Sequence, residues 1–156
     1  MIIVLREEST PPTFLILPVL SRKWTANPKM DETNIELVNK FINAYNSYDV
    51  DAMLSLIHPE ISFRNVFRGR VDVQAVGREE FKKFALRSAR LFAERRQEII
   101  SLLVIQDRVI AEIKYHAIVA HNSSEGFKKG TSIDIDGKSE YSFRDGLIST
   151  ILDETR

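Results

Sequence analysis

The sequence predicts an α+β domain, with helices concentrated in its first part and an antiparallel sheet in its second. Two patterns lead to this prediction. Before residue 95, apolar residues recur at the three- and four-residue spacing of amphipathic helices in three segments, with one strand among them. After residue 95 they alternate with polar residues over most of the chain. A length of 156 residues is enough for one such domain with a substantial core.

The composition excludes several classes of function. The 22 basic and 22 acidic residues cancel, so the chain has no broad electrostatic footprint for nucleic acid or an anionic membrane. Cysteine is absent, which excludes disulfides, thiol catalysis and cysteine-ligated metals. No apolar run approaches the roughly 18 residues that a membrane-spanning helix needs. We therefore expect a soluble, cytoplasmic protein.

The first 29 residues differ from the rest of the chain. They contain four of the five prolines and the only tryptophan. Proline lacks an N–H group and restricts the residue before it, so no long helix or central strand is expected here. We expect a poorly packed N-terminal extension over residues 1–29 and one domain over residues 30–156. Translation from Met30, just before the first helix signal, is a hypothesis that the sequence leaves open.

Two helices are expected before residue 60. Thr33 and Glu36 have the spacing of a capping box, which predicts that the first helix begins there. Asp49 is a suitable cap for a second, short helix that Pro59 ends. The apolar stripe of the first helix consists of Ile35, Val38, Ile42 and Tyr45, widened by Leu37, Phe41, Ala44 and Tyr48.

The next elements follow from a change of period. Residues 61–67 alternate and predict a strand, whereas residues 68–77 show no clean period and predict a loop. Glu79 and Glu80 favour the start of a third helix through its dipole. Four strands are then expected over residues 97–106, 109–119, 131–144 and 147–153. Gly137 predicts a bulge or bend in the third of these.

Three segments resemble the NTF2-like superfamily, specifically its SnoaL-like and ketosteroid-isomerase-like members. They are FINAYNSYDVDAMLSLIHPEISF (residues 41–63), VGREEFKKFA (76–85) and YSFRDGLISTILDE (141–154). The resemblance spans roughly residues 31–154. It implies a cone-shaped fold, in which a curved, mostly antiparallel sheet and three helices enclose a pocket. Because fold does not imply function, it implies no particular activity.

The resemblance also bears on mechanism. Ketosteroid isomerases use a strand carboxylate as base, with a helix tyrosine and a neutral aspartic acid as hydrogen-bond donors. The matching positions here are Asn65, Phe41 and a position near Ser139. An asparagine cannot abstract a proton, and a phenylalanine donates no hydrogen bond. We therefore do not expect that mechanism.

Other candidates for acid–base chemistry are few. SnoaL-like cyclases, by resemblance, use a histidine and an aspartate within the cavity. Four residues of the later strands remain as catalytic candidates: His116, Asp134, Asp136 and Glu140. Their alternation with apolar residues points them away from a cavity, although the bulge expected at Gly137 could reverse the facing before it and so turn Asp134 and Asp136 inward. Three scattered histidines and no paired carboxylates give no metal site, and no cofactor is predicted.

The resulting hypothesis is a SnoaL-like domain that binds a small, largely apolar molecule in its cavity. The alternative is an isomerase, cyclase or hydratase that works by proton transfer in the same cavity. An outward strand face carrying Ile110 and Ile118 predicts a homodimer. The expected ligand-binding residues are Phe41, Tyr45, Phe63, Asn65, Tyr115, Ser139, Tyr141 and Phe143.

Overall fold

The computed structural model describes residues 28–123 and 126–155. Most of the expected N-terminal extension therefore lies outside the described residues. No helix within these ranges is long and apolar enough to cross a membrane. The elements are α1 (Pro28–Asn46), α2 (Val50–Ser55), β1 (Ile57–Phe67), β2 (Arg70–Val76), α3 (Arg78–Leu91), β3 (Phe92–Ile105), β4 (Arg108–Val119), β5 (Ser132–Arg144) and β6 (Leu147–Thr155).

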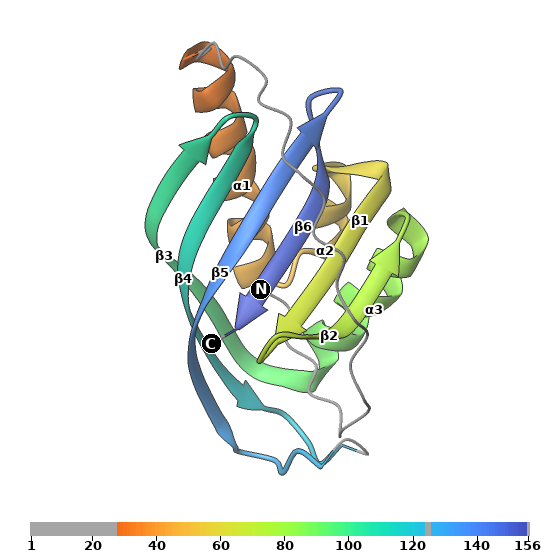
Figure 1. Cartoon of the computed structure of the whole chain (residues 1–156). Coiled ribbons are helices and arrows are strands. Elements are labelled where there is room, and N and C mark those ends of the chain that lie inside the picture. The colour runs from red at the N-terminus through yellow and green to blue at the C-terminus, as the bar shows by residue number, and fades with distance from the viewer. Residues whose placement is uncertain (1–27, 124–125, 156) are drawn as a thin grey trace.

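The strands form one six-stranded sheet in the order β2-β1-β6-β5-β4-β3. All neighbouring pairs are antiparallel except β1 and β6, which are parallel. The three helices lie together behind the sheet in Figure 1, so they cover one face; no helix of the described residues lies on the other, which we call the open face. The α+β class and the cone-shaped architecture are confirmed.

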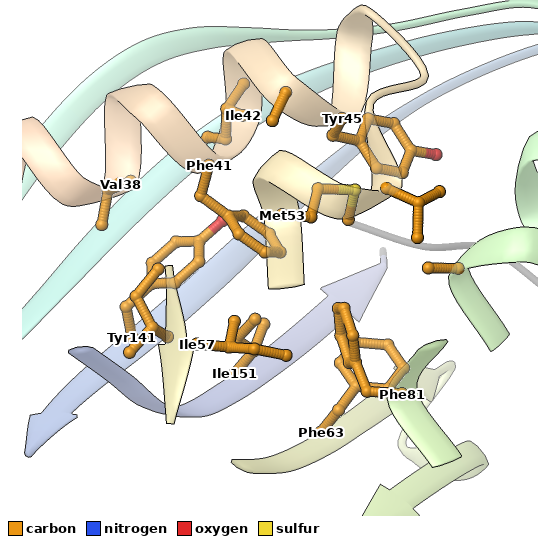
Figure 2. Packing of buried hydrophobic residues seen from close by; sticks show 14 of the residues in the cluster. Val38, Phe41, Ile42, Tyr45, Met53, Ile57, Phe63, Phe81, Tyr141 and Ile151 are labelled. Atoms are coloured by element: carbon orange, nitrogen blue, oxygen red, sulfur yellow. The ribbon is translucent and has the colours of Figure 1, made fainter. Parts of the chain in front are cut away.

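The core lies between the helices and the covered face of the sheet. The Phe41 ring of α1 contacts the Phe81 ring of α3 and the Tyr141 ring of β5, each at a centroid distance of 6.2 Å. Phe63 of β1 meets Phe81 edge-on at 5.7 Å. Figure 2 shows the Phe41 ring beside the Tyr141 ring. Each such aromatic side chain contributes about 1.5–3 kcal/mol through burial.

Two predictions about local structure at the first helices are settled by hydrogen bonds. The capping box is wrong, because α1 is already helical from Pro28 and the Thr33 hydroxyl donates to the Lys29 carbonyl within the helix. The cap at Asp49 is confirmed, because its carboxylate accepts from the Ala52 N–H at 2.9 Å. Pro59 does not end α2; the helix stops at Ser55 and β1 begins at Ile57.

The loop predicted at residues 68–77 and a bulge at Gly137 are wrong, whereas a bend at Gly137 stays a prediction. The expected loop at residues 68–77 contains β2, which pairs antiparallel with β1 although its side chains show no clear alternation. Gly137 causes no bulge, because β5 stays in continuous register with β4 on both sides of it. The irregularity lies instead between Ser142 and Phe143, where β5 pairs with β6. The facing of β5 is therefore constant from Ser132 to Ser142.

Candidate functional site

Three polar side chains lie next to one another on the face of the sheet that the helices cover. Asp153 of β6 lies directly between Asn65 of β1 and Ser139 of β5 in the strand register. Their exposed fractions are 1%, 1% and 0%, respectively. Side chains alternate along a strand, so Asn65 faces the core together with Phe63, and Asp153 together with Ile151. We call Asn65, Ser139 and Asp153 the polar floor.

The polar floor is only partly satisfied. The Ser139 hydroxyl donates to Asp153 Oδ1 at 2.6 Å. Neither the nitrogen nor the oxygen of the Asn65 side-chain amide has a hydrogen-bond partner, although both atoms are buried. An unpaired buried polar group costs about 1–3 kcal/mol. The floor therefore keeps one donor group and one acceptor available for another molecule.

Tyr141 adds a hydroxyl next to the polar floor. Its ring is buried and its hydroxyl oxygen has no hydrogen-bond partner. Burial raises the pKa of the Tyr141 phenol, and the negative charge of Asp153 raises it further. The nearby Ser139 hydroxyl lowers this pKa, but by less than the other two causes raise it. The phenol thus stays protonated and can donate a hydrogen bond.

A second group of polar residues lies where α1 meets β3 and β4. The hydroxyls of Tyr45 and Tyr115 are 3.2 Å apart. Arg95 is buried with its guanidinium carbon 3.9 Å from the centre of the Tyr45 ring and 4.4 Å from that of Tyr48. It donates to Ser88 Oγ and to the Tyr45 carbonyl, each at 3.0 Å.

The two groups belong to one interior. Burial is the main cause that raises the pKa of the Tyr45 phenol; the positive charge of Arg95 opposes it, and Asp153 adds a smaller increase. The charges of Arg95 and Asp153 therefore both act on the Tyr45 phenol. Arg95 and Asp153 are the two charged residues that are fully buried in the described part of the chain.

Seven of the eight expected ligand-binding residues come together in this interior. Phe143 does not belong to this group. It is only half-buried and lines a separate cleft of about 470 Å³ beside the start of α1, with Met30 and Asn34. The seven buried residues are Phe41, Tyr45, Phe63, Asn65, Tyr115, Ser139 and Tyr141.

The four catalytic candidates lie outside this interior. His116 Nδ1 and Asp134 Oδ1 are 2.7 Å apart and partly or largely exposed, and the hydrogen bond from His116 lowers the pKa of Asp134. Asp136 is exposed, and Glu140 pairs with Arg108. Without a bulge at Gly137, β5 presents these carboxylates to the open face. In the described ranges, no three His, Asp or Glu side chains gather in a way that could hold a metal ion.

Sequence reasoning missed Asp153 and Arg95. For Asp153 a signal existed, because Ile151, Asp153 and Thr155 alternate and Ile151 is a core residue by pattern. For Arg95 no local signal existed. It lies near the start of β3, in a charged stretch that the pattern assigns to the surface.

The buried tyrosines predict a dependence of stability on alkaline pH. Burial raises the pKa of all four tyrosines above the value of about 10 in an unfolded chain. The unfolded state therefore loses these protons near pH 10 while the folded state keeps them. Stability should be full below about pH 10 and fall as the pH rises above it.

This effect can be followed through the near-ultraviolet absorbance of phenolate, together with denaturant unfolding at several alkaline pH values. Tyr48, which is partly exposed, should ionise first. The other three should ionise only as the protein unfolds. Ionisation of Tyr45, Tyr115 and Tyr141 near pH 10 in folded protein would contradict their burial.

Comparisons with known proteins agree with this architecture. A candidate polyketide cyclase from Xanthomonas campestris pv. campestris superposes with a TM-score of 0.70 at 22% identity, covering 81% of this chain and 93% of that one. A candidate SnoaL-like polyketide cyclase from Jannaschia sp. CCS1 gives 0.67 at 16%, covering 84% and 90%. AclR of Streptomyces galilaeus, a candidate hydroxylase, gives 0.66 at 19%, covering 81% and 76%.

At these identities the structural neighbours establish the fold alone. A sequence search of curated proteins found no match. The family model of the SnoaL-like domain matches residues 38–151, well over half of the chain. The chain therefore belongs to the SnoaL-like family.

Proposed function

We propose that this domain binds a small, largely apolar molecule on the covered face of its sheet, with a hydroxyl or carbonyl oxygen of that molecule placed at the polar floor. The observation that carries the proposal is the Asn65 amide, which is buried beside Asp153 with no partner for either polar atom. Core packing alone gives no reason to place an amide there.

The surroundings suit such a ligand. Phe41, Phe63 and the Tyr141 ring supply apolar surface, and the few polar groups among them would orient a bound molecule. Because the floor residues are almost completely buried, a ligand reaches them only when the elements around the interior move apart.

Replacing Asn65 with leucine tests the proposal. The substitution Asn65→Leu removes two unpaired buried atoms and keeps the volume similar, so it should raise the free energy of unfolding by about 1–3 kcal/mol. It should also reduce the amount of small molecule that co-purifies with the protein, as measured by native mass spectrometry.

Asn46→Leu is the matched control. The Asn46 amide donates to the Gln97 carbonyl at 2.9 Å and accepts from the Gln97 N–H at 2.7 Å. Its loss should therefore lower the free energy of unfolding by about 1–3 kcal/mol. If both leucine variants are destabilised alike, the Asn65 amide is satisfied in the native protein and the proposal loses its basis.

Proton-transfer catalysis is a second candidate function, and Asp153 is the observation that favours it. A buried carboxylate can accept a proton from a carbon next to a carbonyl, while the Asn65 amide or the Tyr141 hydroxyl donates to the carbonyl oxygen. Isomerisation, cyclisation and hydration all include such a step.

Deuterium exchange from solvent into polycyclic aromatic ketones would reveal this step by mass spectrometry. The panel is chosen because several structural neighbours are candidate polyketide cyclases. Asp153→Asn should slow the exchange by about 100-fold or more. Ser139→Ala, which keeps the carboxylate and removes its hydrogen bond, should cost less. Equal exchange by the wild type and Asp153→Asn would exclude Asp153 as the base.

We further propose that two copies associate through the open face near the edge strand β3. Residues 99–105 of this strand read IISLLVI, and Ile100, Leu103 and Ile105 are 54%, 56% and 41% exposed. Leu103 lies beside Ile110 of β4 in the register, so the apolar surface continues onto the next strand. An uncovered apolar edge is a surface that proteins usually protect.

Sedimentation at micromolar concentration tests the association. The wild type should sediment as a dimer, and Leu103→Lys should convert it to a monomer because a charge would be buried in the interface. Val71→Lys, at the exposed and opposite edge strand β2, is the control and should leave the dimer intact. A monomeric wild type would refute the proposal.

A further inference from the structure

The Tyr45–Tyr115 pair joins a helix to a strand deep inside the molecule. Tyr45 comes from α1 and Tyr115 from β4, and both rings are buried. Their hydroxyl oxygens are 3.2 Å apart. Tyr45 lies one helical turn after Phe41, so both residues belong to the stripe of α1 that faces the sheet.

Counting hydrogens shows what this pair can donate. Two phenolic hydrogens are present, and the bond between the hydroxyls uses one of them. Ser88 also lies close enough to the Tyr45 hydroxyl to lower the pKa of the phenol. Its oxygen accepts from Arg95 and has a second lone pair, so the acceptor of the remaining phenolic hydrogen is either Ser88 or a ligand oxygen.

Arg95 is a buried cation without a counter-ion. Its guanidinium has five N–H groups, and its hydrogen-bond partners are the Ser88 hydroxyl and the Tyr45 carbonyl. Its Nε atom is buried and has no partner. No residue in the described ranges forms an ion pair with Arg95. A charge taken out of water needs compensation, and two aromatic rings and two neutral acceptors give only part of it.

We propose that the Tyr45–Tyr115 hydroxyl pair, with Arg95 stacked behind it, binds an anionic oxygen of the ligand, such as a carboxylate or an enolate. A phenolic hydrogen of the pair is the donor, and the guanidinium supplies the charge that an anion in a water-free interior requires. This inference rests on the proposed function, since it assigns a second anchor and an acidic character to the same ligand.

The electrostatics of the interior support this assignment. Arg95 acts on the phenols of both Tyr45 and Tyr115 in the direction that lowers the pKa, against the burial that raises it. Asp153 has a smaller effect than Arg95 on Tyr45. The tyrosine pair is therefore the cationic end of the interior and the polar floor is its anionic end. An anion would bind at the first and avoid the second.

Two probes of nearly the same shape test the inference by titration calorimetry with the full chain. They are 2-naphthoate, which is anionic, and 2-naphthamide, which is neutral. The wild type should bind the anion at least about tenfold more tightly, as expected for a charge-assisted hydrogen bond. Tyr115→Phe should remove this preference and change the affinity for naphthamide by no more than about twofold. If Tyr115→Phe does not fold, Tyr45→Phe is titrated with the same two probes and should likewise lose the preference for the anion.

Tyr48→Phe is the matched control, because its hydroxyl donates to the Phe92 carbonyl at 3.4 Å and its ring would still stack on Arg95. It should keep the preference for the anion. Equal affinity of the wild type for both probes, or a preference that survives in both tyrosine-pair variants, would overturn the inference. If the wild type binds both probes equally and Asn65→Leu lowers the affinity for both, the proposed function is supported and the inference about the tyrosine pair is wrong. If neither binds, both fail.

Discussion

The parallel pairing of β1 with β6 is the constraint on which the rest of the structure depends. It joins the first strand of the described residues to the last, and β6 is followed across the sheet by β5, β4 and β3. Its register sets Asn65 opposite Asp153, two residues 88 positions apart in sequence. A shift of β1 by one residue would turn Asn65 to the open face and break up the polar floor. The polar floor is thus a consequence of how the sheet is closed.

That closure also produces a polarised interior. Arg95 and Asp153 are the buried charges of the described chain; Arg95 is stacked against Tyr45 and Asp153 is bonded to Ser139, with no ion pair between them. A buried charge without a partner is strongly destabilising, so each of these two needs compensation from its own surroundings. Both charges act on the Tyr45 phenol, in opposite directions. A molecule with an acidic oxygen at one end and an exchangeable proton at the other would fit this arrangement of charges.

Much of the fold could be predicted from the sequence, because apolar periodicity reports which face of an element is buried. The three helices in the first part of the chain and the four strands in the second part were predicted from this periodicity. β2 could not be found in this way, since an edge strand with a mixed face carries no alternation. The start of α1 was misplaced because a capping-box pattern is also compatible with helix interior, where Thr33 bonds back to Lys29.

The site was predictable to a lesser degree, and for a different reason. Asn65, Ser139 and the tyrosines alternate with core residues, so their inward facing could be read locally. Asp153 is part of the site because the strand register places it beside Asn65. The pairing of strands that are distant in sequence cannot be predicted from the local alternation of residues.

The unsatisfied atoms are not explained by packing. Leucine at position 65 and phenylalanine at position 141 would pack the same space without unpaired polar groups. A core maintained for packing alone would gain from both changes. The described interior keeps an Asn65 amide without a partner and an Arg95 side chain without an ion pair among the described residues. The proposed ligand would supply an oxygen to the first and a negative charge to the second.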